Sequence, residues 1–300
     1  MQGYISECRD PYSNIAFERE LLLARQKAVF LWINDPCVII GRNQNPWAEA
    51  NIEYAHAHDI RLARRFSGGG AVYQDTGNLN YSFILPEQEA IIADRWLADA
   101  FHIMGIHPIP SGRNDWLIQE RKFSGCARCE ENGWVLIHGT LMIHVDLEQL
   151  EKVLCPSPLK LRSRGIESVR SRVINLQEVI PALSVSDAAN AFKTAVPADF
   201  CPAVFAQASQ ALARDLESDS WVFAESPGWE AEYETAGPDG IYRFYFTVEN
   251  GAVSDVKVFT DALDPASPRQ RFQFIIGRKA DLPQLFRLID STLKASNLRT

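Results

Sequence analysis

The sequence predicts an α+β protein with a larger N-terminal domain, residues 1–225, and a small α/β C-terminal domain, residues 229–300. Three observations support this class. Short apolar stretches typical of β-strands alternate with stretches whose apolar residues recur at helical spacing. A chain of 300 residues commonly divides into two domains. Ser226-Pro227-Gly228 has the composition of a linker and marks the boundary.

The first third of the chain predicts a helix followed by strands. Ser13 or Asn14 can cap a helix over residues 15–24, whose apolar side chains share a broad face. Two buried strands, 29–33 and 37–40, flank a polar turn. Further elements expected in this part are a helix at 52–58, a strand at 60–63, a strand at 79–85 and a helix at 91–104.

Two more strands are predicted at 115–118 and 134–145. Alternation in the longer strand places Val135 on one face and both His138 and Thr140 on the other. A histidine and a threonine two residues apart could line a pocket. They could equally be core residues with satisfied hydrogen bonds.

The rest of the chain predicts helices and one hairpin. Helices are expected at 147–154, 187–193, 202–216 and 282–293. Strands at 242–248 and 252–259 flank Glu249-Asn250-Gly251, which is a strong hairpin signal. A domain of about 70 residues is near the lower limit for independent stability, so the small domain is expected to depend on the larger one.

Composition excludes several classes of protein. The net charge of −8 argues against a broad nucleic-acid surface. The first residues show neither a secretory signal nor a transit peptide. No apolar run approaches the roughly 18 residues that a membrane span needs. We therefore expect a cytoplasmic protein with no nucleic-acid or membrane partner.

The six cysteines are scattered, and without a signal peptide we expect them to be reduced. Cys126 and Cys129 form a lone C-x-x-C pair. A zinc ribbon needs a second pair, and a thioredoxin-like site needs its own strand–helix setting. A metal or redox role for this pair is therefore disfavoured.

The stretch RRFSGGGAVYQD, residues 64–75, is the most informative part of the chain. Three consecutive glycines let a ligand approach the backbone, and two arginines precede them. This order suits an anion held by backbone N–H groups and guanidinium groups. It is neither a Walker A loop nor a nucleophile elbow. Taken alone, it could also be a glycine-rich turn without function.

A second stretch, residues 160–173, concentrates five basic residues in an otherwise acidic protein. One interpretation is a solvated loop. The other is a flap with a hinge at Gly165 that closes over phosphate and contributes arginines to it.

Five motifs can be considered together with their spacing. They are RRFSGGGAVYQDTGNLN at 64–80, Asn114-Asp115, RKFSG at 121–125, HGTL at 138–141 and GIESVRSRVINL at 165–176. In order and spacing they resemble the lipoate–protein ligase A family. The similarity runs from Asn14 to about Leu176 and resumes weakly over 258–263, in what looks like the family's accessory domain.

The resemblance implies a mixed β-sheet with flanking helices, as in biotin–protein ligases. It also implies a two-step reaction in which lipoate and Mg-ATP form lipoyl-AMP and pyrophosphate. The lipoyl group then passes to a lysine of an acceptor lipoyl domain, in a 2-oxoacid dehydrogenase E2 subunit or the glycine-cleavage H protein. ATP, Mg²⁺ and lipoate are thus the small molecules that the family uses.

The resemblance also places the family's site on this chain. It puts the catalytic lysine on Lys122 and the adenylate-binding loop on roughly residues 160–172. Contacts to ATP or lipoyl-AMP are implied for Arg65, Ser67, Gly68, Gly69, Gly70, Ala71, Val72, Tyr73, Gln74, Asn78, Asp115, Lys122, His138, Gly139, Thr140, Arg164 and Arg170. Contacts to lipoate are implied for Arg65, Val72, Lys122 and His138.

Elementary chemistry agrees with these implied roles. Lys122 can bridge the lipoate carboxylate and the α-phosphate, which lowers their repulsion. Asp115 could orient Lys122 or help to hold Mg²⁺, and no dedicated protein metal site is expected. Val72 and Trp32 are candidates for the wall of an apolar lipoyl tunnel.

Two alternatives share the fold. Octanoyl- and lipoyltransferases of this superfamily use a cysteine nucleophile and need no ATP, but the segment 111–116, where that cysteine is expected, has none. A non-catalytic binder of lipoyl domains is the other alternative. The sequence departs from the family at Gln74, where a histidine is common, and in the shortness of the accessory domain.

Overall fold

The computed structural model describes residues 1–111, 115–155, 172–237, 240–261 and 271–295. Contacts between Cα atoms divide the chain into two units. The first unit contains Met1–Arg42 and Ala48–Ser218, and the second contains Asn43–Trp47 and Asp219–Thr300. Among the described helices, none is long and apolar enough to cross a membrane.

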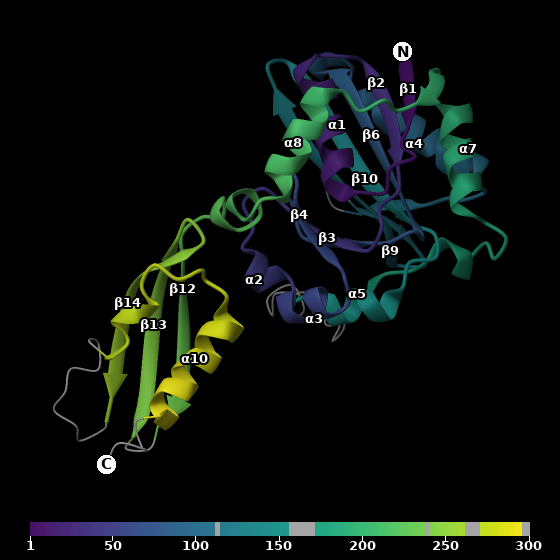
Figure 1. Ribbon diagram of the computed structural model, residues 1–300. Helices are drawn as coiled ribbons and strands as arrows, with labels where there is room; N and C mark the ends of the chain where they lie inside the picture. Colours follow the sequence, from purple (N-terminus) through teal and green to yellow (C-terminus); the bar gives the residue numbers. More distant parts are fainter. Residues whose placement is uncertain (112–114, 156–171, 238–239, 262–270, 296–300) are drawn as a thin grey trace. The chain divides into compact units, whose positions relative to one another are not determined.

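A large mixed sheet forms the centre of the first unit (Figure 1). Its strands are β1 (Gln2–Ile5), β2 (Ala28–Trp32), β6 (Asn78–Pro86), β7 (Ile109–Ser111), β8 (Asp115–Ile118), β9 (Arg121–Glu131), β10 (Trp134–Met142) and β11 (Asp199–Pro202). They lie in the order β11-β1-β2-β6-β10-β9-β8-β7. β1 is parallel to both neighbours, whereas the pairs from β2 through β7 are antiparallel. The predicted α+β class with a mixed sheet is confirmed.

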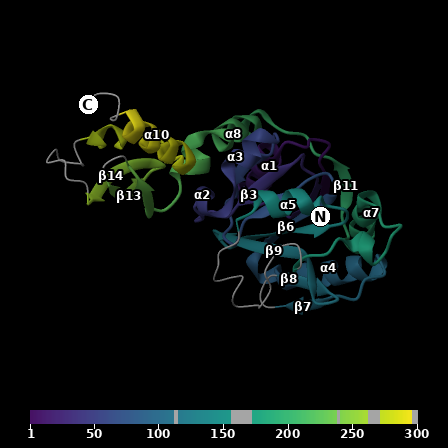
Figure 2. The same ribbon diagram turned by 90° about the horizontal axis from the view of Figure 1, so that it is seen from below.

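Helices cover both faces of this sheet (Figure 1 and Figure 2). The longer helices of the unit are α1 (Pro11–Leu23), α4 (Ile91–Ile103), α7 (Val185–Ala195) and α8 (Gln207–Glu217). On one face, Phe83 of β6 packs with Phe101 of α4 and Phe192 of α7 in a continuous core. On the other face, Phe17 of α1 packs against Phe30 of β2. The central strands β2 and β6 are therefore buried on both sides.

Helix α1 begins earlier than the sequence analysis predicted. Its cap is Asp10, whose carboxylate accepts a hydrogen bond from the Ser13 backbone N–H at 2.8 Å, and Pro11 occupies the first helical turn. The expected caps, Ser13 and Asn14, lie inside the helix. Proline suits the first turn because the missing N–H would have no helical partner there.

A second, smaller sheet lies in the same unit. It consists of β4 (Arg61–Arg64), β3 (Cys37–Ile40) and β5 (Val72–Gln74), in the order β4-β3-β5. The strands expected at 29–33 and 37–40 are both present, but β2 belongs to the large sheet and β3 to the small one. The short helices near this sheet are α3 (Ile52–Ala57) and α5 (Leu147–Val153). A further short helix, α2, covers Pro46–Glu49.

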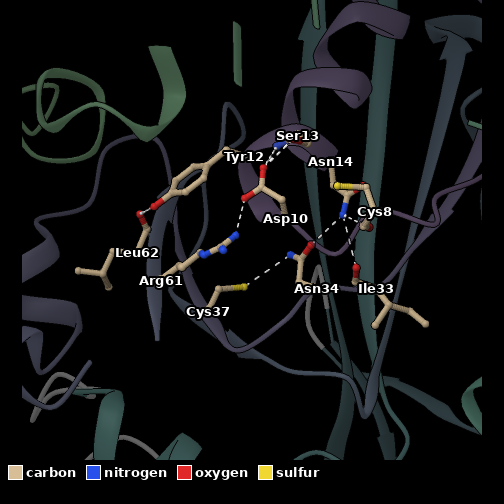
Figure 3. Close-up of polar contacts among 10 residues, drawn as sticks. All are labelled: Cys8, Asp10, Tyr12, Ser13, Asn14, Ile33, Asn34, Cys37, Arg61 and Leu62. Carbon is tan, nitrogen blue, oxygen red and sulfur yellow. Dashed lines mark hydrogen bonds and ion pairs between the residues drawn. The ribbon is translucent and has the colours of Figure 1, made fainter. Parts of the chain in front are cut away.

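Buried amides connect α1 to the small sheet. Asn14 Nδ2 donates to Asn34 Oδ1 at 2.9 Å, and Asn34 Nδ2 lies 3.5 Å from the Cys37 sulfur (Figure 3). Asn34 Nδ2 also donates to Gln74 Oε1 at 2.9 Å. Asn14 and Asn34 have no exposed surface, and Gln74 is 3% exposed. Since buried polar groups stay buried only when they are hydrogen-bonded, this chain of amides fixes β3 and β5 relative to the helix.

Strand β9 was not predicted. The sequence analysis placed residues 119–125 between two strands, but the strand begins at Arg121, directly after a turn in which Gln119 and Glu120 have φ of 50° and 62°. Hydrogen bonding to β8 and β10 on its two sides extends the strand over charged residues and Gly125, which have little intrinsic strand preference.

The second unit contains a separate antiparallel sheet and one long helix. Its elements are β12 (Trp229–Ala236), β13 (Ile241–Glu249), β14 (Ala252–Thr260) and α10 (Leu282–Ala295). The predicted hairpin is confirmed, and Asn250 and Gly251 form its turn with φ of 50° and 73°. The sequence analysis missed β12. Phe244, Phe246 and Ile289 are buried in a small core between the sheet and α10.

Candidate functional site

A cavity of about 160 Å³ lies in the first unit and is lined by α1, both sheets and the glycine stretch. It brings together eleven of the residues that the resemblance implied: Arg65, Gly69, Gly70, Ala71, Val72, Gln74, Asp115, Lys122, His138, Gly139 and Thr140. Trp32 also lines it. Of the others, Ser67, Gly68, Tyr73 and Asn78 do not line it, and Arg164 and Arg170 lie outside the described residues.

Arg65 holds the glycine stretch in its shape. Its Nε donates to Ser67 Oγ at 3.0 Å and its NH1 to Ile39 O at 3.1 Å. Its NH2 donates to the carbonyls of Gly68 and Gly70, at 2.6 and 2.9 Å. Burial lowers the pKa of Arg65 to about 10, against a smaller opposing effect of the Glu18 carboxylate, so the guanidinium stays charged at neutral pH. Most of its donors are thus committed to the loop itself.

The loop leaves backbone donors available to a ligand. Gly69 has a φ of +95°, a conformation that favours glycine, and a Cβ there would lie 2.9 Å from Arg65 NH2. Among the residues that the structure describes, none accepts a hydrogen bond from the backbone N–H of Gly69, Gly70 or Ala71. All three line the cavity. Successive N–H groups of this kind form an anion-binding concavity.

Lys122 and Asp115 form an ion pair beside the loop. Lys122 Nζ is 2.8 Å from Asp115 Oδ1, and both side chains are partly exposed. The ammonium lies directly over Gly125, where an added Cβ would be 2.7 Å from Nζ. Gly125 therefore provides the space for this cation. Val173 and Ile174, the first residues of the chain after Arg172, pair with the backbone of Lys122.

His138 belongs to a buried chain of hydrogen bonds. Its Nδ1 lies 2.7 Å from Glu18 Oε1 and its Nε2 lies 2.6 Å from Ser67 Oγ. In the neutral tautomer whose Nδ1 donates to Glu18, Nε2 accepts from Ser67 Oγ, which itself accepts from Arg65. Glu18 also accepts from Ser82. The network connects α1 to the glycine loop through the sheet.

Glu18 is the cavity residue that the sequence analysis missed most clearly. It lines the cavity and is 2% exposed, and its hydrogen bonds orient His138. A signal was present in the sequence. Glu18 lies three residues after Ile15 and three before Leu21, so it occurs on the apolar face of the helix. A carboxylate on such a face is buried only when it has partners.

The cysteine pair lacks the features of an activated thiol, although Cys126 is part of the cavity lining. Cys126 and Cys129 lie on one strand, three residues apart, so their side chains leave opposite faces of the sheet. Cys126 packs against the core under α4 and α7, and burial raises the pKa of its thiol to about 11. A thiol in that state is almost fully protonated at neutral pH and is a poor nucleophile. No cluster of potential metal-ligating side chains occurs within the described ranges.

We expect the double variant Cys126→Ser, Cys129→Ser to keep turnover within about twofold of the wild type, since neither thiol has an activated environment. The measurement is the rate of acyl transfer to an acceptor domain. Loss of all turnover, with the variant still folded by circular dichroism, would restore the cysteine-dependent mechanism.

The fold and the cavity define a domain whose cavity is lined by a lysine ammonium and a glycine-rich loop. Comparison with known proteins agrees with this class. The model of the lipoyl protein ligase A/B catalytic domain family matches residues 10–197. The chain therefore belongs to the lipoyl protein ligase A/B catalytic domain family, which is a family of enzymes.

Solved structures show the same fold. A chain from the bi-partite lipoate protein ligase and E2 lipoyl domain system of Thermoplasma acidophilum is 26% identical, with a TM-score of 0.63 over 74% of this chain and 96% of that one. LipL1 of P. falciparum, solved in complex with lipoate, is 22% identical with a TM-score of 0.63, over 93% and 90% of the two chains. Lipoate-protein ligase A bound with ATP is 24% identical with a TM-score of 0.62, over 74% and 98%.

Proposed function

We propose that this protein is an ATP-dependent lipoate–protein ligase that forms lipoyl-AMP and transfers the lipoyl group to a lysine of a lipoyl domain. The observation that carries the proposal is the position of the Lys122 ammonium. It lies at a cavity that also presents the backbone N–H groups of Gly69, Gly70 and Ala71. A cation that shares a cavity with backbone N–H groups of a loop that are unpaired among the described residues suits the joining of two anions.

In the first step, a carboxylate oxygen of lipoate attacks the α-phosphorus of ATP, the bond to the bridging oxygen breaks, and pyrophosphate leaves. Both reactants are anionic, so their approach requires a cation. Lys122 donates to the lipoate carboxylate and to an α-phosphate oxygen, and it stabilises the charge that develops there. Asp115, 2.8 Å from Nζ, holds the ammonium in position. The loop N–H groups bind phosphate oxygens.

Magnesium enters as the counter-ion of ATP. This ion prefers oxygen ligands and is usually bound by one or two carboxylates together with substrate phosphates. Asp115 is a carboxylate of the cavity lining beside Lys122, so it fits that requirement. When bound, Mg²⁺ supplies neutralisation of the phosphate charge.

In the second step, the amine of an acceptor lysine attacks the acyl carbon of lipoyl-AMP. An amide forms, the acyl–phosphate bond breaks, and AMP leaves with the electron pair. The amine nucleophile comes from the partner, so the enzyme needs no covalent intermediate. The proposed acceptors are lipoyl domains of 2-oxoacid dehydrogenase E2 subunits and the glycine-cleavage H protein.

Mass spectrometry of an acceptor lipoyl domain tests the proposal. The domain is incubated with the protein and lipoate, with and without Mg-ATP. We expect the mass increase of one lipoyl group only when ATP is present. A matched sample receives octanoyl-loaded acyl carrier protein in place of lipoate and ATP. Transfer of the octanoyl group in that sample alone would identify a transferase. If the acceptor domain were modified in none of the samples, the protein would be a non-catalytic binder of lipoyl domains.

A further inference from the structure

Five residues form a straight row across the floor of the cavity. Trp32 of β2 is paired in register with Asn80 of β6, Asn80 with Thr140 of β10, Thr140 with Gly125 of β9, and Gly125 with Asp115 of β8. Residues paired across strands project from the same face of a sheet, and all five line the cavity. The row therefore gives the cavity a direction, from the Lys122–Asp115 pair at one end to Trp32 at the other.

The length of this row matches an eight-carbon acid. The Lys122 ammonium lies over Gly125, and Asn80 is two strands further along the row. Strands are about 4.8 Å apart, so this interval is about 10 Å. Seven C–C bonds of about 1.5 Å, in zigzag, span roughly 9 Å. A carboxylate at Lys122 therefore places the distal carbons of an extended C8 chain at Asn80.

The side-chain amide of Asn80 has a hydrogen-bond donor, Nδ2, that is not used within the described part of the chain. The residue is 1% exposed, and its Oδ1 accepts a hydrogen bond of 3.4 Å from Asn78 Nδ2. Its own Nδ2 has no hydrogen-bond partner within the part of the chain that the structure describes. Buried polar groups are rarely left in this state. The neighbouring Trp32 differs, because its indole N–H is already bonded to Ser82.

We propose that the Asn80 amide selects an acyl chain whose distal end carries a hydrogen-bond acceptor, and that it distinguishes the dithiolane of lipoate from a plain fatty acyl tail. This inference rests on the proposed function for the identity of the acid. A dithiolane sulfur is a weak acceptor, but octanoate offers none. Octanoate therefore leaves Nδ2 buried without a partner, and sites that hydrogen-bond a substrate group discriminate against analogues that lack it.

Two variants of equal shape isolate the donor. Asn80→Thr keeps an O–H donor. The valine of Asn80→Val has nearly the same volume as threonine but no hydrogen-bond donor. Both residues are β-branched and favour strands, so the two variants have matched effects on β6. Calorimetry measures binding of lipoate and octanoate to each full-length protein. A third acid, 5-cyclopentylpentanoate, has the ring of lipoate without its sulfur atoms and tests the wild-type protein by itself.

In the wild type we expect lipoate to bind about tenfold more tightly than either sulfur-free acid. Asn80→Thr should keep most of this ratio, and Asn80→Val should reduce it to within about twofold. Equal ratios of lipoate affinity to octanoate affinity in the Asn80→Thr and Asn80→Val variants would overturn the inference. Equal binding of lipoate and 5-cyclopentylpentanoate by the wild type would also overturn it, even if neither variant folds.

Exchange of pyrophosphate into ATP, measured with the same acids, separates this inference from the proposed function. Preferential binding of lipoate without any exchange would support the role of Asn80 and contradict the ligase. Exchange that proceeds equally with lipoate and octanoate would support the ligase and contradict the role of Asn80.

Discussion

Replacing Lys122 with alanine is expected to lower lipoate-dependent ATP–pyrophosphate exchange by about 10²–10³-fold, because removal of one charge-stabilising donor typically costs that much. Lys122 is the cation that lies at the cavity and over Gly125. The substitution also removes the ion-pair partner of Asp115, so the negative charge of this carboxylate is left uncompensated at a proposed site for two anions. We therefore expect kcat to fall and the KM for lipoate to rise.

Lys27→Ala is the matched control. The Lys27 side chain is 39% exposed and the Lys122 side chain 31%, and each forms an ion pair with one carboxylate. Lys27 lies away from the cavity lining, so its variant should keep wild-type exchange. If Lys122→Ala retained more than about a tenth of the exchange rate, the role assigned to Lys122 in the first step would be wrong.

Arg65→Ala should lower the free energy of unfolding by roughly 3 kcal/mol and abolish exchange. The guanidinium donates to three backbone carbonyls and to Ser67 in a buried setting, and alanine leaves these acceptors without donors. The carbonyls of Gly68 and Gly70 then have no group that draws them together. The loop N–H groups lose their convergent arrangement as a result. Urea unfolding measures the first effect, and pyrophosphate exchange measures the second.

Arg61→Ala provides the comparison for Arg65. Arg61 lies on the same strand, β4, and its side chain is 47% exposed in an ion pair with Asp10. An exposed pair of this kind contributes about 1 kcal/mol or less. Equal losses of stability in the two variants would contradict the assignment of Arg65 as the residue that holds the loop.

Local patterns determined much of the fold. Alternation in residues 134–145 correctly placed His138 and Thr140 on one face of a strand and Val135 on the other, because side-chain direction along a strand has a period of two. The turn at Asn250-Gly251 was evident for a similar reason, since few residues accept positive φ at both positions. The start of α1 was misplaced because Ser13 and Asn14 are good caps wherever they occur, and the sequence does not show which cap is used.

The sequence by itself determined the chemistry that this protein can carry. The glycine stretch, the lysine at 122 and the resemblance of five motifs already indicated an anion site for an adenylate. Those features are local, because the conformational freedom of glycine and the charge of a side chain follow from the residue type.

The tertiary structure decided how these groups are used. Pairing among β2, β6, β10, β9 and β8 aligned Trp32, Asn80, Thr140, Gly125 and Asp115 in one row. The tertiary structure also directs the Arg65 side chain onto its own loop and brings Glu18 to His138, which is more than a hundred residues away in the sequence. Strand neighbours are set by long-range burial and register, which no local pattern contains. Arg65 shapes the glycine stretch through its bonds to the Gly68 and Gly70 carbonyls, and β9 brings Lys122 to the same cavity, so the proposed anion site depends on contacts between distant parts of the chain.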